Sequence, residues 1–311
     1  MSGARTEDLH PAAMGLDILP DAAALDLLLA QQTDALAAVS GALPAIAAGA
    51  TIMAVAVRQG GRLVYVGAGS SALMAHSDAA ELPGTFGLPA ARIVVLMAGG
   101  IPDGADMPGG TEDDVAAARR DGAGIQAGDV VIAVTASGKT PYPLAIAETA
   151  KARGARVIAI ANNPGAAIFD LADAAICLRT PPELIAGSTR MGAGTAQKVA
   201  LNLMSTLMAI RLGHVHDGMM VNLVADNLKL RRRAAGIVAS IAGVGDVAAA
   251  DALGLTGGNV KAAVLVAQGA DPAEADTTLA ATGGNLRHAL ARGASPAAAI
   301  SYQRPTKGVS K

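Results

Sequence analysis

Three short segments rich in glycine and hydroxyl side chains could together hold a phosphate group. They are Gly67-Ala68-Gly69-Ser70-Ser71, Thr135-Ala136-Ser137-Gly138-Lys139-Thr140, and Gly187-Ser188-Thr189-Arg190-Met191-Gly192-Ala193-Gly194-Thr195. The first two follow apolar, strand-like runs and the third opens an apolar helical run, so N–H groups and hydroxyls can converge at one edge of a sheet. None has the spacing of a nucleotide P-loop or of a dinucleotide-binding fingerprint. The pattern predicts a site for a small phosphorylated metabolite.

Two glutamates lie where a carboxylate could reach such a ligand. Glu112 follows a Gly- and Pro-rich loop after the second strand-like run, on the same edge of the predicted sheet. Glu81 lies about a dozen residues beyond the first phosphate loop, and a helix rises ~1.5 Å per residue, so Glu81 would sit near the far end of that helix. A site shared in a dimer would solve this problem of reach. One ionised carboxylate could remove a proton, and a second, partly buried one could donate a proton.

A structural interpretation of Glu112 stays open beside the catalytic one. Thr111-Glu112-Asp113-Asp114 resembles an ordinary helix start, where acidic side chains complement the helix dipole. Other chemistry has less support, because the sequence has no H-E-x-x-H, C-x-x-C or G-x-S-x-G motif. His76, His214 and His216 are not spaced as a metal site, and Cys177 ends an apolar run typical of a buried thiol. We therefore expect neither a metal site nor a serine nucleophile.

Five apolar, β-branched runs, separated mostly by segments that could be helices, predict an α/β fold with a doubly wound, five-stranded parallel sheet. The runs are Arg62 to Val66, Arg92 to Met97, Asp129 to Thr135, Arg156 to Ala161 and Ala174 to Leu178. Such sheets bind ligands beyond the carboxyl ends of their strands, where the first two loops begin.

The chain divides by pattern into three parts. We expect residues 1–54 to form an N-terminal arm with helices, 55–217 the α/β domain that carries the predicted phosphate site, and 218–311 a small C-terminal helical subdomain. Within the last two parts, we expect helices over Thr195 to Gly213 and Gly218 to Ile241, then small helices from Asp246 to Arg292. The end, Arg304 to Lys311, is expected to be frayed.

The composition narrows the range of partners and compartments. The net charge is −2, and the largest basic cluster, Arg231-Arg232-Arg233, fits a solvated helix face; with two Phe, three Tyr and no Trp, no nucleic-acid partner is expected. Ala35 to Val57 has no charged residue, but Ala, Gly, Ser, Thr and Pro44 dominate it, so it predicts two packed helices rather than a membrane span. The expected compartment is the cytoplasm.

Several motifs follow one another in order over nearly the whole chain. They include Gly60 to Gly69, Asp78-Ala79-Ala80-Glu81 with Thr85-Phe86-Gly87, Ala136 to Tyr142, Gly187 to Met191, Ala193 to Lys198, Leu201 to Thr206, Gly283 to Arg287 and, near the start, Thr6-Glu7 with Pro11-Ala12. Together these motifs resemble those of the N-acetylmuramic acid 6-phosphate etherase family of sugar isomerase (SIS) domain proteins.

The resemblance implies a homodimeric lyase of cell-wall amino-sugar recycling that needs no cofactor. Its members release D-lactate from N-acetylmuramic acid 6-phosphate by elimination and hydration. By position, Glu81 falls on the proton donor to the departing lactate, and Glu112 on the carboxylate that takes the C2 proton. The implied substrate-binding residues are Gly69, Ser70, Ser71, Ser137, Gly138, Thr140, Ser188, Thr189 and Arg190, the last as a charge partner.

The chain departs from the family pattern at positions that carry charge. Ala72-Leu73 stands where the family usually has Gly-Arg, and Gly192 stands where it has Lys; Gly109 replaces an acidic residue and His10 an Asn. Two cations are thus missing from the ligand side. Two alternatives therefore stay open: a non-catalytic phosphosugar-binding regulator resembling the glucokinase regulatory protein, and a phosphosugar isomerase, which would release no lactate.

Overall fold

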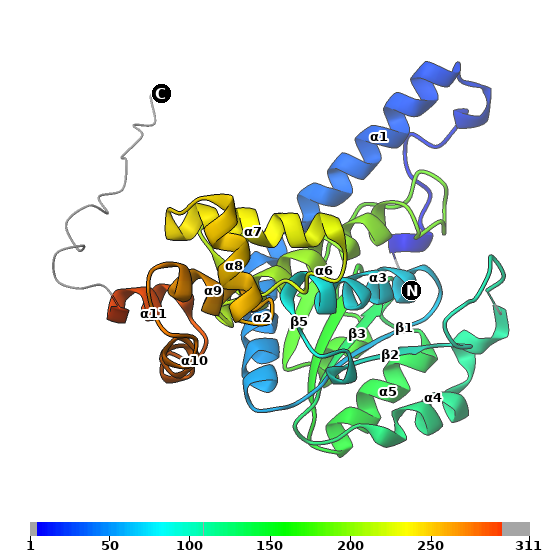
Figure 1. The fold of residues 1–311 in the computed structure, drawn as a ribbon. Helices are drawn as coiled ribbons and strands as arrows, with labels where there is room; N and C mark the ends of the chain where they lie inside the picture. Colours follow the sequence, from blue (N-terminus) through cyan, green and yellow to red (C-terminus); the bar gives the residue numbers. More distant parts are fainter. Residues whose placement is uncertain (1–4, 108, 294–311) are drawn as a thin grey trace. The chain divides into compact units, whose positions relative to one another are not determined.

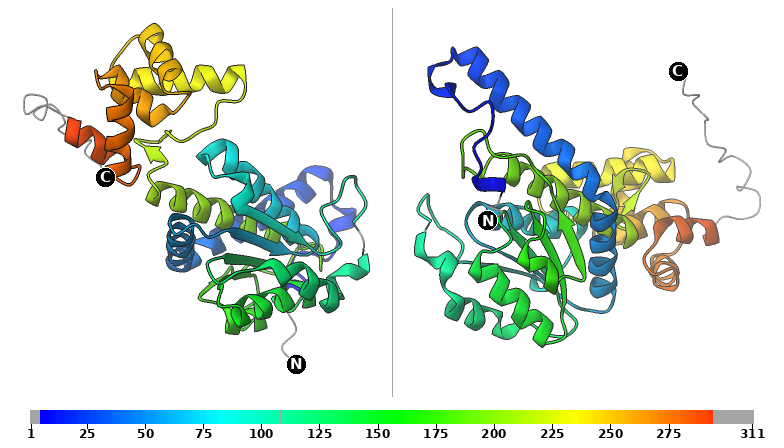
Figure 2. Two further views of the ribbon diagram at one scale, coloured as in Figure 1. Left: turned by 60° about the horizontal axis from the view of Figure 1, so that its bottom comes forward. Right: turned by 180° about the vertical axis from the view of Figure 1, so that it is seen from behind.

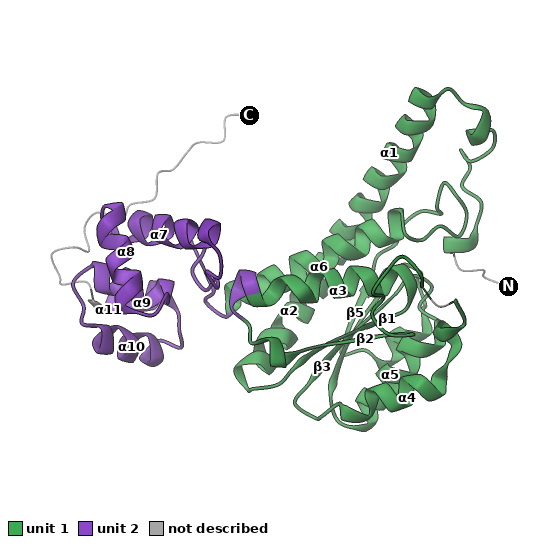
Figure 3. Cartoon of the chain, turned by 45° about the vertical axis from the view of Figure 1, so that its right-hand side comes forward, with its two compact units in different colours: residues 1–83, 88–211 green, residues 84–87, 212–311 purple. Residues whose placement is uncertain are grey.

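The computed structural model describes residues 5–107 and 109–293, which form two compact units (Figure 3). The first unit comprises residues 1–83 and 88–211, and the second comprises 84–87 and 212–311. The expectation of a frayed end at Arg304 to Lys311 lies outside the described residues. The three-part division drawn from the sequence stays a proposal.

The first unit is built on a five-stranded, all-parallel sheet (Figure 1). Its spatial order is β2-β1-β3-β4-β5. The strands are β1 (Leu63–Gly67), β2 (Ile93–Met97), β3 (Val130–Thr135), β4 (Arg156–Ala161) and β5 (Ala174–Cys177). Each begins and ends within one residue of a run predicted from the sequence, and the predicted fold class is confirmed.

The strand order creates a switch point between β1 and β3. From β1 the chain passes through α3 (Gly69–Phe86) to the outer strand β2, whereas from β3 it passes through α5 (Pro141–Ala152) toward β4. These helices cover opposite faces of the sheet (Figure 2). The carboxyl ends of β1 and β3 therefore lie side by side, and the loops that follow them lead to opposite faces of the sheet. Such a switch point leaves room for a ligand between the two loops.

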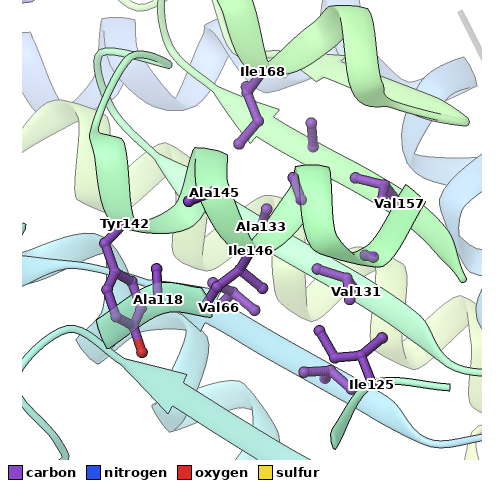
Figure 4. Close-up of a cluster of buried hydrophobic side chains, with 14 of the residues drawn as sticks. Val66, Ala118, Ile125, Val131, Ala133, Tyr142, Ala145, Ile146, Val157 and Ile168 are labelled. Atoms are coloured by element: carbon purple, nitrogen blue, oxygen red, sulfur yellow. The ribbon is translucent and has the colours of Figure 1, made fainter. Parts of the chain in front are cut away.

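Both faces of the sheet are buried, as the continuous apolar runs predict. On one face, α5 packs against β1, β3 and β4 through a cluster that includes Val66, Val131 and Ile146, and α4 (Val115–Asp121) packs against α5 (Figure 4). On the other face, α2 (Leu43–Arg58) packs against α6 (Gly192–Arg211) and β5. Short 3-10 turns lie at Arg5–Glu7, Leu16–Ile18, Ala38–Ala42, Ala90–Arg92, Gly109–Asp113, Gly122–Gly124 and Ala167–Leu171.

The helical segment Asp21–Arg58 is long and apolar enough to cross a membrane by length and composition alone. In the structure it consists of α1 (Asp21–Ala37) and α2, joined by the 3-10 turn Ala38–Ala42, with Pro44 in the first turn of α2. Ile46, Ala50 and Met53 of α2 are fully buried. The contacts of α2 are those of a core helix, in agreement with the sequence interpretation, whereas the first half of α1 extends beyond the sheet (Figure 3).

A buried carboxylate sets the start of α6. Glu183 accepts hydrogen bonds from the N–H groups of Gly192 and Ala193, at 2.9 and 2.8 Å, and from Nε2 of Gln31 in α1 at 2.8 Å. Its side chain thus satisfies helix-terminal donors that would otherwise lack partners and lies at the positive end of the helix dipole. The helix begins three residues earlier than the predicted start at Thr195, because this cap acts at Gly192.

An ion pair joins the beginnings of β1 and β3. The Arg62 side chain donates to both carboxylate oxygens of Asp129, at 3.1 and 2.6 Å, and the Asp129 carboxylate also accepts from the backbone N–H groups of Arg62 and Gln126. Burial alone would raise the pKa of Asp129, but these hydrogen bonds and the Arg62 charge outweigh it and hold the pKa below its usual value.

The second unit is a helical subdomain preceded by a small hairpin. β6 (Val215–His216) and β7 (Met219–Met220) pair antiparallel, followed by α7 (Leu228–Ala242), α8 (Asp246–Leu255), α9 (Val260–Ala267), α10 (Pro272–Ala281) and α11 (Leu286–Gly293). The small helices expected from Asp246 onward are present. The helix expected from Gly218 is wrong over its first ten residues, because Asp217 and Gly218 have positive φ in the hairpin turn and Asn227 caps α7.

Asp129→Asn is expected to lower the free energy of unfolding at pH 7 by about 2 kcal/mol, because it weakens a buried, hydrogen-bonded ion pair. A carboxyl whose pKa is lowered by folding stabilises the protein above its unfolded pKa, and this stabilisation is lost as pH falls through the folded pKa. Urea unfolding between pH 7 and 3 should therefore show a smaller acid-induced loss in the variant than in the parent. The exposed Asp103→Asn serves as the control; equal pH dependence in all three proteins would contradict the assignment.

Glu183→Gln is expected to destabilise the first unit by about 1–2 kcal/mol, because the amide keeps one acceptor oxygen while its NH₂ group faces backbone donors at the start of α6. Urea unfolding measures the loss. Glu148→Gln on the exposed surface of α5 is the matched control. An unchanged unfolding midpoint in Glu183→Gln would show that the carboxylate is not needed as a cap.

Candidate active site

A polar pocket of about 320 Å³ opens at the carboxyl ends of β1 and β3. All three segments singled out in the sequence contribute to it, together with two residues near the start of the chain. Its lining residues are Thr6, Glu7, Ala68, Gly69, Ser70, Ser71, Met107, Glu112, Thr135, Ala136, Ser137, Thr140, Gly187 and Thr189.

The first turn of α3 supplies one wall of this pocket. Gly69 begins the helix at a φ of 53°, and Ser70 and Ser71 follow it in the first turn. The N–H groups of this turn have no intrahelical partners, and the helix dipole makes the N-terminus positive. This wall is suited to an anion such as a phosphate group.

The loop after β3 supplies hydroxyls that hold one another in place. Oγ1 of Thr135 lies 3.0 Å from Oγ1 of Thr140 and accepts from the N–H of Gly138 at 3.3 Å, while Ser137 Oγ accepts from the N–H of Lys139 at 3.2 Å. Gly138 has a φ of 73°, and a Cβ there would lie 2.1 Å from the Cβ of Ala166. Gly138 does not line the pocket; it shapes the turn that presents Ser137 and Thr140.

The third loop reaches the pocket through Gly187 and Thr189 only. Ser188 and Arg190, also predicted to bind substrate, are not among the lining residues, so their roles remain predictions. Among the lining residues that the structure describes there is no Lys or Arg. A phosphate in this pocket would therefore be met by N–H groups and hydroxyls of the protomer.

Glu112 lies in the pocket on the 3-10 turn Gly109–Asp113. Its Oε1 would be 3.3 Å from a Cβ at Gly69, so the carboxyl lies directly beside the start of α3. The helix-start interpretation applies instead to Asp114, whose carboxylate accepts from the N–H of Ala117 at 2.8 Å and caps α4. Glu112 is thus left available to a ligand's reacting atoms.

Glu81 lies outside the pocket, in the last turns of α3, with 62% of its side chain exposed. Its Oε1 lies 3.9 Å from Nζ of Lys198 in α6, and this ammonium donates to Ser77 Oγ at 3.1 Å. One protomer therefore does not bring Glu81 and Glu112 together around a single ligand. The assignment of Glu81 to a site shared with a second subunit remains a prediction.

A buried network fixes the helix one turn before Glu81. Asp78 accepts hydrogen bonds from Tyr65 Oη at 2.9 Å and from Asn202 Nδ2 and Ser205 Oγ at 3.0 Å each. Burial raises the pKa of Asp78 in spite of these donors, and burial and the Asp78 charge raise the pKa of Tyr65 well above its usual value. The network ties β1, α3 and α6 together, so it holds the backbone from which Glu81 extends.

Sequence reasoning did not assign Thr6 and Glu7 to the site. They belong to the 3-10 turn Arg5–Glu7, which ends 60 positions before Gly67 of the first phosphate loop, and no local spacing connects them to it. The family-like Thr6-Glu7 motif was the available signal. In the part of the chain that the structure describes, no group of three or more His, Cys, Asp or Glu side chains could hold a metal ion.

Comparison with known proteins places this chain in a family. A family model described as "SIS domain" matches residues 27–162. The N-acetylmuramic acid 6-phosphate etherase of Deinococcus radiodurans is 42% identical over 292 residues, covering 93% of this chain and 96% of that protein. The etherase of Burkholderia lata is 42% identical over 92% of this chain and 95% of its own length, and that of Streptomyces avermitilis 40% over 92% and 93%. The chain belongs to the N-acetylmuramic acid 6-phosphate etherase family.

Proposed function

We propose that this protein is a carbon–oxygen lyase that converts N-acetylmuramic acid 6-phosphate into N-acetylglucosamine 6-phosphate and D-lactate. The observation that supports this most directly is a single pocket in which Glu112 shares the walls with the first turn of α3 and the hydroxyl loop after β3. Anion-binding groups and a carboxylate base are thereby placed within reach of one sugar phosphate.

The walls of the pocket suggest how the substrate is held. The first turn of α3, with Ser70 and Ser71, would bind the phosphate together with the hydroxyls of Ser137, Thr140 and Thr189. This arrangement would direct the sugar carbons toward the Glu112 carboxyl beside Gly69. Positioning of this kind contributes to the rate because the reacting groups no longer have to find one another.

The reaction itself is an elimination followed by a hydration. The sugar ring opens to an aldehyde at C1, whose carbonyl acidifies the proton on C2. Glu112 takes that proton, the C3–O bond breaks, and the departing lactate oxygen takes a proton from Glu81. Water then adds its oxygen to C3 of the unsaturated aldehyde while C2 regains a proton, so one general base and one general acid suffice.

Glu81 can take part only if the active assembly brings it to the pocket of another protomer, and we therefore propose a homodimer with shared sites. Large apolar side chains on α1 support an assembly, because Leu25, Leu29 and Leu36 are 64%, 67% and 45% exposed. We further propose that the enzyme acts in the cytoplasm in peptidoglycan amino-sugar recycling, without a cofactor.

Glu112→Gln and Glu81→Gln are each expected to lower the rate of D-lactate release from N-acetylmuramic acid 6-phosphate by about 10²–10⁴-fold, the usual contribution of a general base or acid. An enzymatic D-lactate assay under saturating substrate gives the measurement. The exposed Glu148→Gln should keep the parent's rate. Near-parental activity in either site variant would remove that glutamate from the mechanism.

Assays of the parent protein with sugar phosphates distinguish the alternative functions. Lactate release supports the lyase, whereas interconversion of an aldose phosphate and a ketose phosphate without lactate would support an isomerase. Binding of sugar phosphates with no turnover of either kind would support a non-catalytic regulator. Either of the last two results would contradict the proposed function.

A further inference from the structure

The turn Arg5–Glu7 is joined to the pocket by a buried side-chain contact. Thr6 is 3% exposed, and its Oγ1 accepts a hydrogen bond from Nδ2 of Asn163 at 3.2 Å. The same amide donates to the carbonyl oxygen of Ala136 at 3.0 Å. Asn163 therefore holds both this turn and the hydroxyl loop after β3, so Glu7 is attached to the framework that shapes the site.

Glu7 places a second carboxylate in the pocket that already contains Glu112. Its Oε2 would lie 3.5 Å from a Cβ at Gly187, whereas Glu112 lies beside Gly69. The two carboxylates thus border different loops. A Cβ at Gly187 would also be strained, because its φ is 74°, and this bare stretch of backbone leaves space for the Glu7 side chain.

The charge of Glu7 limits what it can bind. An ionised carboxylate only accepts hydrogen bonds, and it repels other anions. The described lining residues offer no Lys or Arg that would neutralise it. Phosphate is therefore a poor partner for Glu7, whereas the neutral O–H and N–H donors of a sugar are good ones.

We propose that Glu7 is a specificity-determining residue whose carboxylate accepts a hydrogen bond from a hydroxyl or the acetamido N–H of the bound sugar. It would select neutral donors at this part of the pocket and disfavour ligands that place an anion there. The inference rests on the proposed function, because it deepens the description of the same sugar-phosphate site. It assigns Glu7 to the sugar and leaves the phosphate to the other walls.

The test compares two ligands that differ by the sugar. Inorganic phosphate and N-acetylglucosamine 6-phosphate are titrated by calorimetry into the parent, Glu7→Ala, Glu7→Gln and the adjacent control Asp8→Asn, whose residue does not line the pocket. Loss of a hydrogen bond to a charged group should weaken sugar-phosphate binding about ten- to hundredfold in Glu7→Ala. Inorganic phosphate should bind equally or more tightly, since a repelling charge is gone. Glu7→Gln should fall between, and Asp8→Asn should match the parent.

Weaker binding of the sugar phosphate without weaker binding of inorganic phosphate separates recognition from structural support. Equal weakening of both ligands would show that Glu7 only holds the pocket together, and unchanged sugar-phosphate binding would show that it makes no contact; each overturns the proposal. Repeating the titration with glucose 6-phosphate, which has no acetamido group, identifies the donor. If Glu7 accepts from the acetamido N–H, Glu7→Ala should weaken the binding of glucose 6-phosphate less than that of N-acetylglucosamine 6-phosphate.

The binding test does not depend on turnover. A parent that binds N-acetylglucosamine 6-phosphate but releases no lactate from N-acetylmuramic acid 6-phosphate would contradict the proposed reaction, while the Glu7 comparison would still be decided. A parent that binds no sugar phosphate would overturn both. Should Glu7→Ala fail to fold, Glu7→Gln carries the comparison, because it keeps the size of the side chain.

Discussion

Close contact between the end of β1 and the first turn of α3 determines the geometry of the whole pocket. A Cβ at Gly67 would lie 2.9 Å from the backbone N and Cα of Ala72 and 3.1 Å from the carbonyl oxygen of Val134. Only a residue without a side chain allows the helix to begin so near the strand and beside β3. The helix N-terminus is therefore held at the sheet edge, where Glu112 and the hydroxyl loop also meet it.

This contact explains how a pocket without a lining Lys or Arg could hold an anion. The helix N-terminus and the interlocked hydroxyls of Thr135, Ser137 and Thr140 are fixed by packing before any ligand arrives. Fixed dipoles of this kind stabilise a negative charge without reorganising when the ligand binds. Glu112 and Glu7 are the only charged side chains among the described lining residues, so both charged groups that line the pocket are hydrogen-bond acceptors.

The strands and the first two loops could be predicted from local sequence pattern, whereas contacts between distant segments could not. Apolar β-branched runs identified the five strands of the parallel sheet, and the position of Ser70 and Ser137 after strands predicted their common edge. The pattern could not show that Asn163 would draw the turn of Glu7 into the site, because 157 residues separate Asn163 from Thr6. Nor could it show which side chains of the third loop face the pocket, since that depends on the cap of α6.

The Glu183 cap of α6 also offers a physical reason for the glycine at position 192. The resemblance drawn from the sequence implies a Lys at the position of Gly192, where a Cβ would lie 2.3 Å from Nε2 of Gln31 and 3.0 Å from the Cβ of Ala35. Gln31 occupies this space and donates to Glu183, the carboxylate that caps α6. Gln31 of α1 can therefore reach Glu183 only because residue 192 has no side chain. A Lys side chain at position 192 would require Gln31 to move, which would take a donor away from the buried Glu183 carboxylate.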